Sequence, residues 1–77
     1  MAEERMLDVR VTIRAGGEPF DEIMRAVAAL APGEDLVLLA PFEPTPLYGV
    51  LAAQGYTHVT AALGAGDYRV RFSRGEP

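Results

Sequence analysis

Apolar and polar residues alternate along residues 7–14, so that every second side chain is apolar. This period of two predicts a half-buried strand. A second strand is predicted over 36–40, because this continuous apolar run is too short for a helix between the turn signals that flank it. Two more strands are predicted over 57–63 and 68–73, where the alternation returns, and the Gly-Ala-Gly-Asp sequence between them predicts a hairpin turn.

Two other segments place apolar residues at helical spacing, and each has a proline at its start. Proline is well tolerated in the first turn of a helix, where its missing N–H has no intrahelical partner to lose. The first predicted helix therefore begins at Pro19, and it ends at Pro32-Gly33. The second begins at Pro46, with Thr45 as its expected N-cap, and closes at Gly55.

The order of predicted elements is strand, helix, strand, helix, strand, strand. A strand–helix–strand connection of this length implies that the first two strands are parallel and that the crossover is right-handed. The predicted fold class is therefore an α/β (α+β) two-layer sandwich, in which a four-stranded mixed sheet carries both helices on one face. The 77 residues suffice for a single domain, 1–77, whose ends at 1–5 and 74–77 are expected to fray.

Composition removes several kinds of chemistry from consideration. The chain has no cysteine and one histidine, which argues against disulfides, thiolate chemistry and multi-histidine metal centres, so no metal and no cofactor is expected. Its net charge of −4 argues against a general nucleic-acid binder. No apolar run approaches the ~20 residues of a membrane span, and the acidic N-terminus is not that of a signal peptide, so a cytoplasmic protein is expected.

Three stretches of the sequence resemble the TusA/SirA-like sulfur-carrier fold: Leu7-Asp8, Gly17-Glu18-Pro19, and the run from Ala31 to Leu36. That family carries a Cys-Pro-x-Pro motif at the start of its first helix. Matching the motif to this chain puts Gly16 at the cysteine and Pro19 at the second proline. The resemblance implies the family's fold, and the glycine at the carrier position implies that this chain does not perform the family's thiol chemistry.

The stretch from Pro41 to Leu47 is similar to an uncharacterised, cysteine-less sister family, domain of unknown function 2249. That family reads Asp-His-Asp-Pro-x-Pro-Leu at this place, and Pro44, Pro46 and Leu47 match it here. Pro41 and Phe42 depart from the pattern, and the departure removes the histidine. The resemblance covers nearly the whole chain and implies a fold, but it implies no activity.

The edge at which the two parallel strands end is the first candidate site, since ligands of open α/β sheets bind there beside helix N-termini. Two loops supply its residues: Arg14, Gly16, Gly17 and Glu18 from the first, and Phe42, Glu43 and Thr45 from the second. The glycines would permit close approach of a ligand or partner backbone, and an arginine can hold an anion. The alternative interpretation is a tight glycine turn between ordinary helix starts.

The open face of the predicted sheet is the second candidate site. By alternation this face carries Arg10, Thr12 and Arg14 from the first strand and Arg69, Arg71 and Ser73 from the last, so most of the positive charge of the chain is expected there. Such a surface would attract an acidic protein partner, whereas a single-stranded nucleic acid would also need stacking aromatics. The alternative is a solvated sheet face whose charges prevent edge pairing.

No catalytic residue is predicted. The one histidine, His58, has no sequence neighbour that it could activate, so an enzyme is not expected. The sequence favours a non-catalytic protein-interaction module with a protein partner, and the alternative is a small-anion or small-metabolite binding domain that uses the helix N-termini. A homodimer is a further alternative, because Phe42 and Tyr48 lie near a predicted exposed loop, where aromatic side chains can support self-association.

Overall fold

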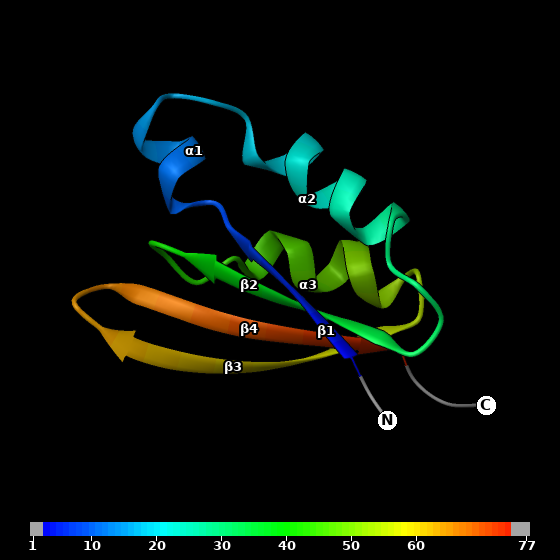
Figure 1. Ribbon diagram of the computed structural model, residues 1–77. Coiled ribbons are helices and arrows are strands. Elements are labelled where there is room, and N and C mark those ends of the chain that lie inside the picture. The colour runs from blue at the N-terminus through cyan, green and yellow to red at the C-terminus, as the bar shows by residue number, and fades with distance from the viewer. Residues whose placement is uncertain (1–2, 75–77) are drawn as a thin grey trace.

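A twisted four-stranded sheet carries three helices on one of its faces in the computed structural model, which describes residues 3–74 (Figure 1). The elements in chain order are β1 (Glu3–Asp8), α1 (Arg10–Arg14), α2 (Pro19–Ala28), β2 (Glu34–Ala40), α3 (Thr45–Ala52), β3 (Tyr56–Gly64) and β4 (Asp67–Arg74). The predicted fold class, a mixed four-stranded sheet with helices on one face, is confirmed. The short helix α1 is an addition to the predicted order.

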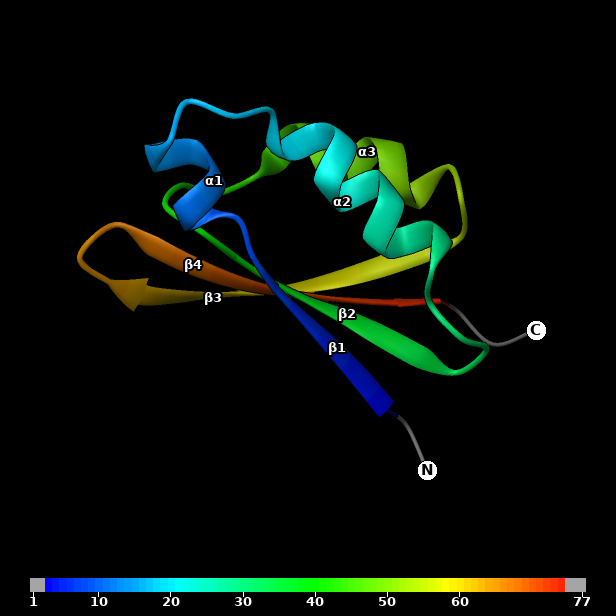
Figure 2. The same ribbon diagram turned by 45° about the horizontal axis from the view of Figure 1, so that its top comes forward.

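The strands lie in the order β1-β2-β4-β3. The β1 and β2 strands are parallel, as the crossover rule predicts, and β4 pairs antiparallel with both β2 and β3. Figure 2 shows that α1, α2 and α3 all lie over the same face, which leaves the other face of the sheet open. The carboxyl ends of β1 and β2 therefore meet at one edge of the helical layer, next to α1.

The first strand was predicted over 7–14, and this prediction was wrong: the strand ends at Asp8 and a helix begins at Arg10. The Asp8 carboxylate accepts the backbone N–H of Arg10 at 3.0 Å, a local bond that competes with continued sheet pairing. Val9 and Ile13 are four residues apart, so the same apolar spacing also fits one side of a helix. Val9 is buried and Ile13 packs on the core, whereas Val11 is exposed.

The expected fraying of residues 1–5 was also wrong for Glu3, Glu4 and Arg5, because these residues form the first half of β1. At the other end, β4 continues through Arg74. Residues 1–2 and 75–77, where fraying was also expected, lie outside the described residues.

The core lies between the sheet and the helices. The alternation of β4 points Val70 and Phe72 inward, as predicted, and both are almost completely buried. They pack with inward residues of β2 and with the buried faces of α2 and α3, which contribute Ile23, Val27, Leu47 and Leu51. This core fixes the positions of the helix starts and so shapes the edge where β1 and β2 end.

Candidate functional site

An apolar groove opens at the carboxyl ends of β1 and β2, with a volume of about 150 Å³. The strand ends supply its floor, and the starts of α2 and α3 supply its walls. The lining residues are Val9, Ile13, Pro19, Phe20, Ile23, Leu38, Ala40, Phe42, Pro44, Pro46 and Leu47. Every one of these side chains is apolar, so the groove offers contact surface and no charged group.

The prolines contribute to the apolar character of the walls, although two helices begin here. A helix start normally presents unpaired backbone N–H groups, which attract anions. Pro19 and Pro46 lie in the first turns of α2 and α3 and lack that N–H. Phe20 and Phe42 lie beside them and are each 48% exposed, which is unusual for such large apolar side chains. The groove therefore meets solvent through two phenylalanine rings.

Exposed acidic residues are sequence neighbours of the residues that line the groove. Glu18 precedes Pro19, Asp21 follows Phe20, and Glu43 follows Phe42, and all three acidic residues are exposed. Arg14, at the end of α1, is the basic residue of the same loop region. The residues beside the groove are consequently acidic on balance.

The loop between α1 and α2 contains Gly16 and Gly17, and its amides are already bonded. The Gly16 N–H donates to the Ile13 carbonyl at 3.0 Å, and the Gly17 N–H donates to the Thr12 carbonyl at 2.8 Å. Gly16 has a φ of +79°, in the left-handed region that favours glycine. These bonds close α1 and turn the chain into α2, so the tight-turn interpretation accounts for both glycines.

Thr45 belongs to the second loop of the predicted site and was expected to be the N-cap of the helix. It is instead the first residue of α3, and Pro44 is the N-cap. The Thr45 N–H donates to the Glu43 carbonyl at 2.9 Å. The sequence-predicted residues of the two loops thus lie at the same edge of the sheet, and they form the polar surroundings of an apolar groove. The backbone amides of Gly16, Gly17 and Thr45 are engaged within the chain.

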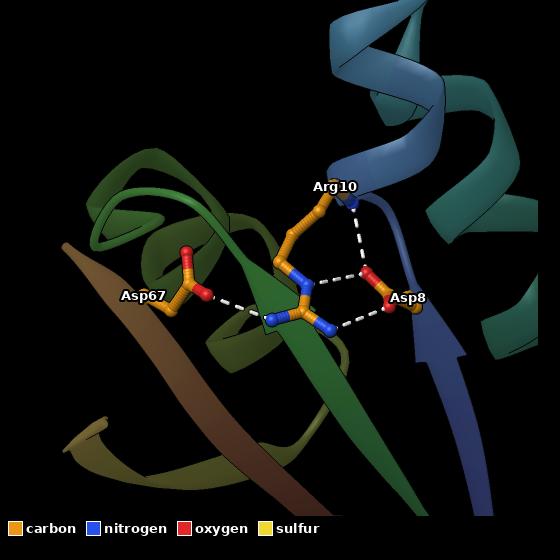
Figure 3. Close-up of polar contacts among 3 residues, drawn as sticks. All are labelled: Asp8, Arg10 and Asp67. Carbon is orange, nitrogen blue, oxygen red and sulfur yellow. Dashed lines mark hydrogen bonds and ion pairs between the residues drawn. The ribbon is translucent and has the colours of Figure 1, made fainter. Parts of the chain in front are cut away.

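Arg10 forms the most connected polar cluster of the described residues (Figure 3). Its guanidinium donates to both oxygens of Asp8, at 2.9 and 2.8 Å, and to Asp67 at 2.7 Å. These bonds tie the end of β1 to the start of β4. The expectation that Arg10, Thr12 and Arg14 face outward from the open sheet was wrong, because all three belong to α1.

The pKa of Asp8 shows how strongly this cluster favours the charged carboxylate. The side-chain hydrogen bond from Arg10 is the largest cause, and together with the backbone bond it lowers this pKa to about 2 from 3.8. Because the folded pKa lies below the unfolded one, the stabilising effect is complete above about pH 4 and disappears as the pH falls toward 2.

We therefore expect Asp8→Asn to lower the free energy of unfolding at pH 6, and we expect its difference from the parent chain to shrink between about pH 4 and pH 2. Urea unfolding followed by circular dichroism across this range measures the effect. In an Arg10→Met background, the same substitution should lose this pH dependence. An equal pH dependence in both backgrounds would show that Arg10 is not its cause.

The open sheet face carries fewer free arginines than predicted. Arg69 and Arg71 do point to this face, beside Met6 and Val59. The Arg71 guanidinium, however, is hydrogen-bonded to Glu4 and, at 2.8 Å, to Asp35. These bonds raise the pKa of Arg71 and neutralise its charge locally. Within residues 3–74, Arg69 has no carboxylate partner within ion-pair distance.

His58 lies on the helix-facing side of β3, where its ring stacks on Tyr48 with centroids 3.6 Å apart. The Tyr48 hydroxyl contacts the Thr60 hydroxyl at 2.5 Å and donates to Glu43 at 3.2 Å. Burial raises the pKa of Tyr48. Across residues 3–74, no group of three or more His, Asp or Glu side chains is arranged to hold a metal ion.

The structure brings the sequence-predicted loop residues to one edge of the sheet, but the apolar groove at that edge was not predicted. The available signal was the series of prolines and phenylalanines in the two loops, which were interpreted as helix starts. These residues together predict an apolar surface where the two strands end. That prediction requires knowing that β1 ends at Asp8. The sequence missed the Asp8–Arg10–Asp67 cluster because Asp67 is distant along the chain.

None of the helices over residues 3–74 is long and apolar enough to cross a membrane. Neither a search of curated proteins nor a search of solved structures finds a match to this chain. The sequence profile of one family, described as Uncharacterized conserved protein (DUF2249), matches residues 6–74. The match runs from β1 through β4 and includes every residue of the groove. The chain therefore belongs to the DUF2249 family.

Proposed function

We propose that this protein is a non-catalytic interaction module that binds an apolar side chain of a protein partner in the groove beside Phe20 and Phe42. The observation that carries the proposal is the groove itself: all of its lining side chains are apolar, and two half-exposed phenylalanines stand at its entrance. Exposed aromatic residues around a small apolar depression are typical of the centres of protein interfaces.

The size of the groove favours a protein side chain over a free metabolite. Its volume of about 150 Å³ is below the roughly 300–1,000 Å³ of most small-molecule sites. An anion is also a poor fit, because the amides of Gly16, Gly17 and Thr45 already donate within the chain. The apolar lining further supports a role without catalysis, since no lining side chain could act as a nucleophile, acid or base.

The charges around the groove define the partner further. Glu18, Asp21 and Glu43 are exposed beside the lining residues, with Arg14 as the basic residue of the same region. Charges at the rim of an interface steer association and select against like-charged partners. We therefore expect a partner segment in which one or two large apolar residues are flanked by Lys or Arg.

Selection of random displayed peptides on the full chain tests this proposal. The expected result is a shared pattern, an aromatic or aliphatic residue beside Lys or Arg, in the peptides that bind. Phe42→Ala should weaken binding of a selected peptide by about tenfold or more, since truncation of a central aromatic residue removes much of the interface. The control is Met6→Ala, which truncates another exposed apolar residue on the opposite face and should leave peptide affinity unchanged.

Two results would contradict the proposal. Selected peptides that bind equally well to the Phe42→Ala variant would place the interaction elsewhere. Amide shifts at Gly16, Gly17 and Thr45 on titration with inorganic phosphate, without a peptide pattern, would favour the anion-binding alternative instead.

A further inference from the structure

The outer edge of the sheet at β3 is long and unprotected. Within residues 3–74, β3 is an edge strand, because it pairs with β4 alone. Its pairing is regular from Tyr56 to Ala62, and the one irregularity lies between Ala62 and Gly64, next to the turn. In an antiparallel pair, alternate residues of an edge strand direct their backbone N–H and C=O groups away from the neighbouring strand. The edge therefore presents a row of backbone donors and acceptors.

Proteins usually protect such an edge with charged residues, proline, a bulge or a covering segment. β3 contains no Asp, Glu, Lys, Arg or Pro. Figure 1 shows β3 along the border of the sheet, and within residues 3–74 no helix or strand covers its outer side. The opposite edge differs, because β1 begins with Glu3, Glu4 and Arg5. Protection is thus present at one edge of this sheet and absent at the other.

Val59 lies near the middle of β3 and is 71% exposed on the open face of the sheet. A strand of such composition, with Thr57 and Thr60 as further β-branched residues, has high propensity to pair. Pairing with another strand would cover part of Val59 and satisfy the backbone groups of the edge together. A β-strand is therefore the partner that is complementary to this edge.

We propose that the occupant is the β3 strand of a second copy of this chain, paired antiparallel across a twofold axis. The pairing joins the two four-stranded sheets into one continuous sheet, with both Val59 side chains on the same face. A twofold interface needs a surface that is complementary to itself, which two identical antiparallel strands provide.

The distribution of charge supports a second copy of the chain as the partner at the β3 edge. Each chain has a net charge of −4, so two copies repel one another at most orientations. The uncharged β3 edge allows them to approach with no like-charge contact along the paired strands. A single edge strand buries less surface than a standard interface of roughly 1,600 Å², so the dimer is expected to be in exchange with the monomer.

Sedimentation velocity on the full chain tests the inference with two matched variants. Val59→Lys and Met6→Lys each place a lysine at an exposed apolar position on the open face, one in β3 and one in β1, and change the net charge equally. Over about 10 µM to 1 mM, which covers dimers of modest affinity, the parent chain should shift from monomer to dimer. Val59→Lys should weaken dimerisation by about tenfold or more, as edge charges do, and Met6→Lys should not.

Circular dichroism is the control for folding. Both variants should remain folded, since exposed substitutions usually change the free energy of unfolding by less than about 0.5 kcal/mol. A parent chain that stays monomeric up to about 1 mM would overturn the inference, because pairing of millimolar affinity or better should appear in that range. Dimerisation that survives Val59→Lys would overturn it too. Equal weakening by Met6→Lys would assign the contact to the sheet face and not to the β3 edge. The groove is remote from these positions, so the outcome is independent of the peptide result.

Discussion

Replacing Phe72 by alanine should lower the free energy of unfolding by about 3–5 kcal/mol, the usual cost of removing a buried phenylalanine. Phe72 is 1% exposed and is among the largest fully buried side chains of the core. It lies opposite Leu36 in the sheet, and its ring centroid is 6.3 Å from that of Tyr48. The substitution would therefore leave a cavity between β4 and the helical layer.

The size of the chain makes this loss severe. Stabilities of roughly 0.05–0.15 kcal/mol per residue are typical, so a domain of this length has only about 4–12 kcal/mol in total. Guanidinium unfolding followed by circular dichroism measures the change. Phe20→Ala is the control, because Phe20 is half-exposed at the groove and should cost less than about 1.5 kcal/mol. Similar costs for the two substitutions would mean that the burial of Phe72 is misassigned.

Gly17→Ala should lower the free energy of unfolding by about 1–3 kcal/mol, because the α1–α2 loop has no room for a side chain there. A Cβ at this position would lie 2.9 Å from Thr12 Cγ2 and 3.2 Å from the Thr12 carbonyl oxygen. Thr12 has little freedom to move, since its hydroxyl donates to Glu22 of α2 at 2.5 Å. The loop would have to shift away from α1.

A second substitution separates this steric effect from any other. Thr12→Ser removes Cγ2 and retains the hydroxyl that binds Glu22, so it should recover part of the stability lost in Gly17→Ala. Urea unfolding of the two single variants and the double variant gives the coupling free energy directly. Additive effects would show that the contact with Thr12 is not what requires glycine.

Hydrophobic periodicity predicted most of the fold because several elements follow one clear rule each. β2 is a short apolar run between turns, β4 alternates strictly, and α2 and α3 begin near prolines. Their bounds differ from the predicted ones by a few residues at most. The resemblance to the DUF2249 family, noted from Pro44, Pro46 and Leu47, is confirmed by the family match.

The first strand could not be predicted from periodicity alone. Residues 7–14 fit a strand by alternation, but Val9 and Ile13 also fit one side of a helix. A side-chain bond decided between them, because the Asp8 carboxylate holds the Arg10 N–H where the sheet would otherwise continue. The change at Asp8 moved three expected sheet-face residues onto α1. A local hydrogen bond thus altered the predicted composition of a whole surface.

The sequence predicted that the two loops of the candidate site meet at one edge of the sheet, and it did not predict the apolar lining found there. Topology alone places the ends of β1 and β2 together, and this part of the prediction holds. Whether this edge is polar or apolar depends on which loop side chains are buried. Here Pro44 is buried and Glu43 is exposed. The charges of Arg10 and Arg71 could not be interpreted from the sequence either, because their partners Asp67 and Glu4 are far away along the chain.

The most direct test of the groove as a docking site is an NMR titration of the full chain with a selected basic–apolar peptide. We expect shifts to concentrate at groove residues such as Val9, Ile13 and Leu47, which would surround the bound side chain. Shifts centred on Val59 and Arg69, on the opposite face of the sheet, would contradict it.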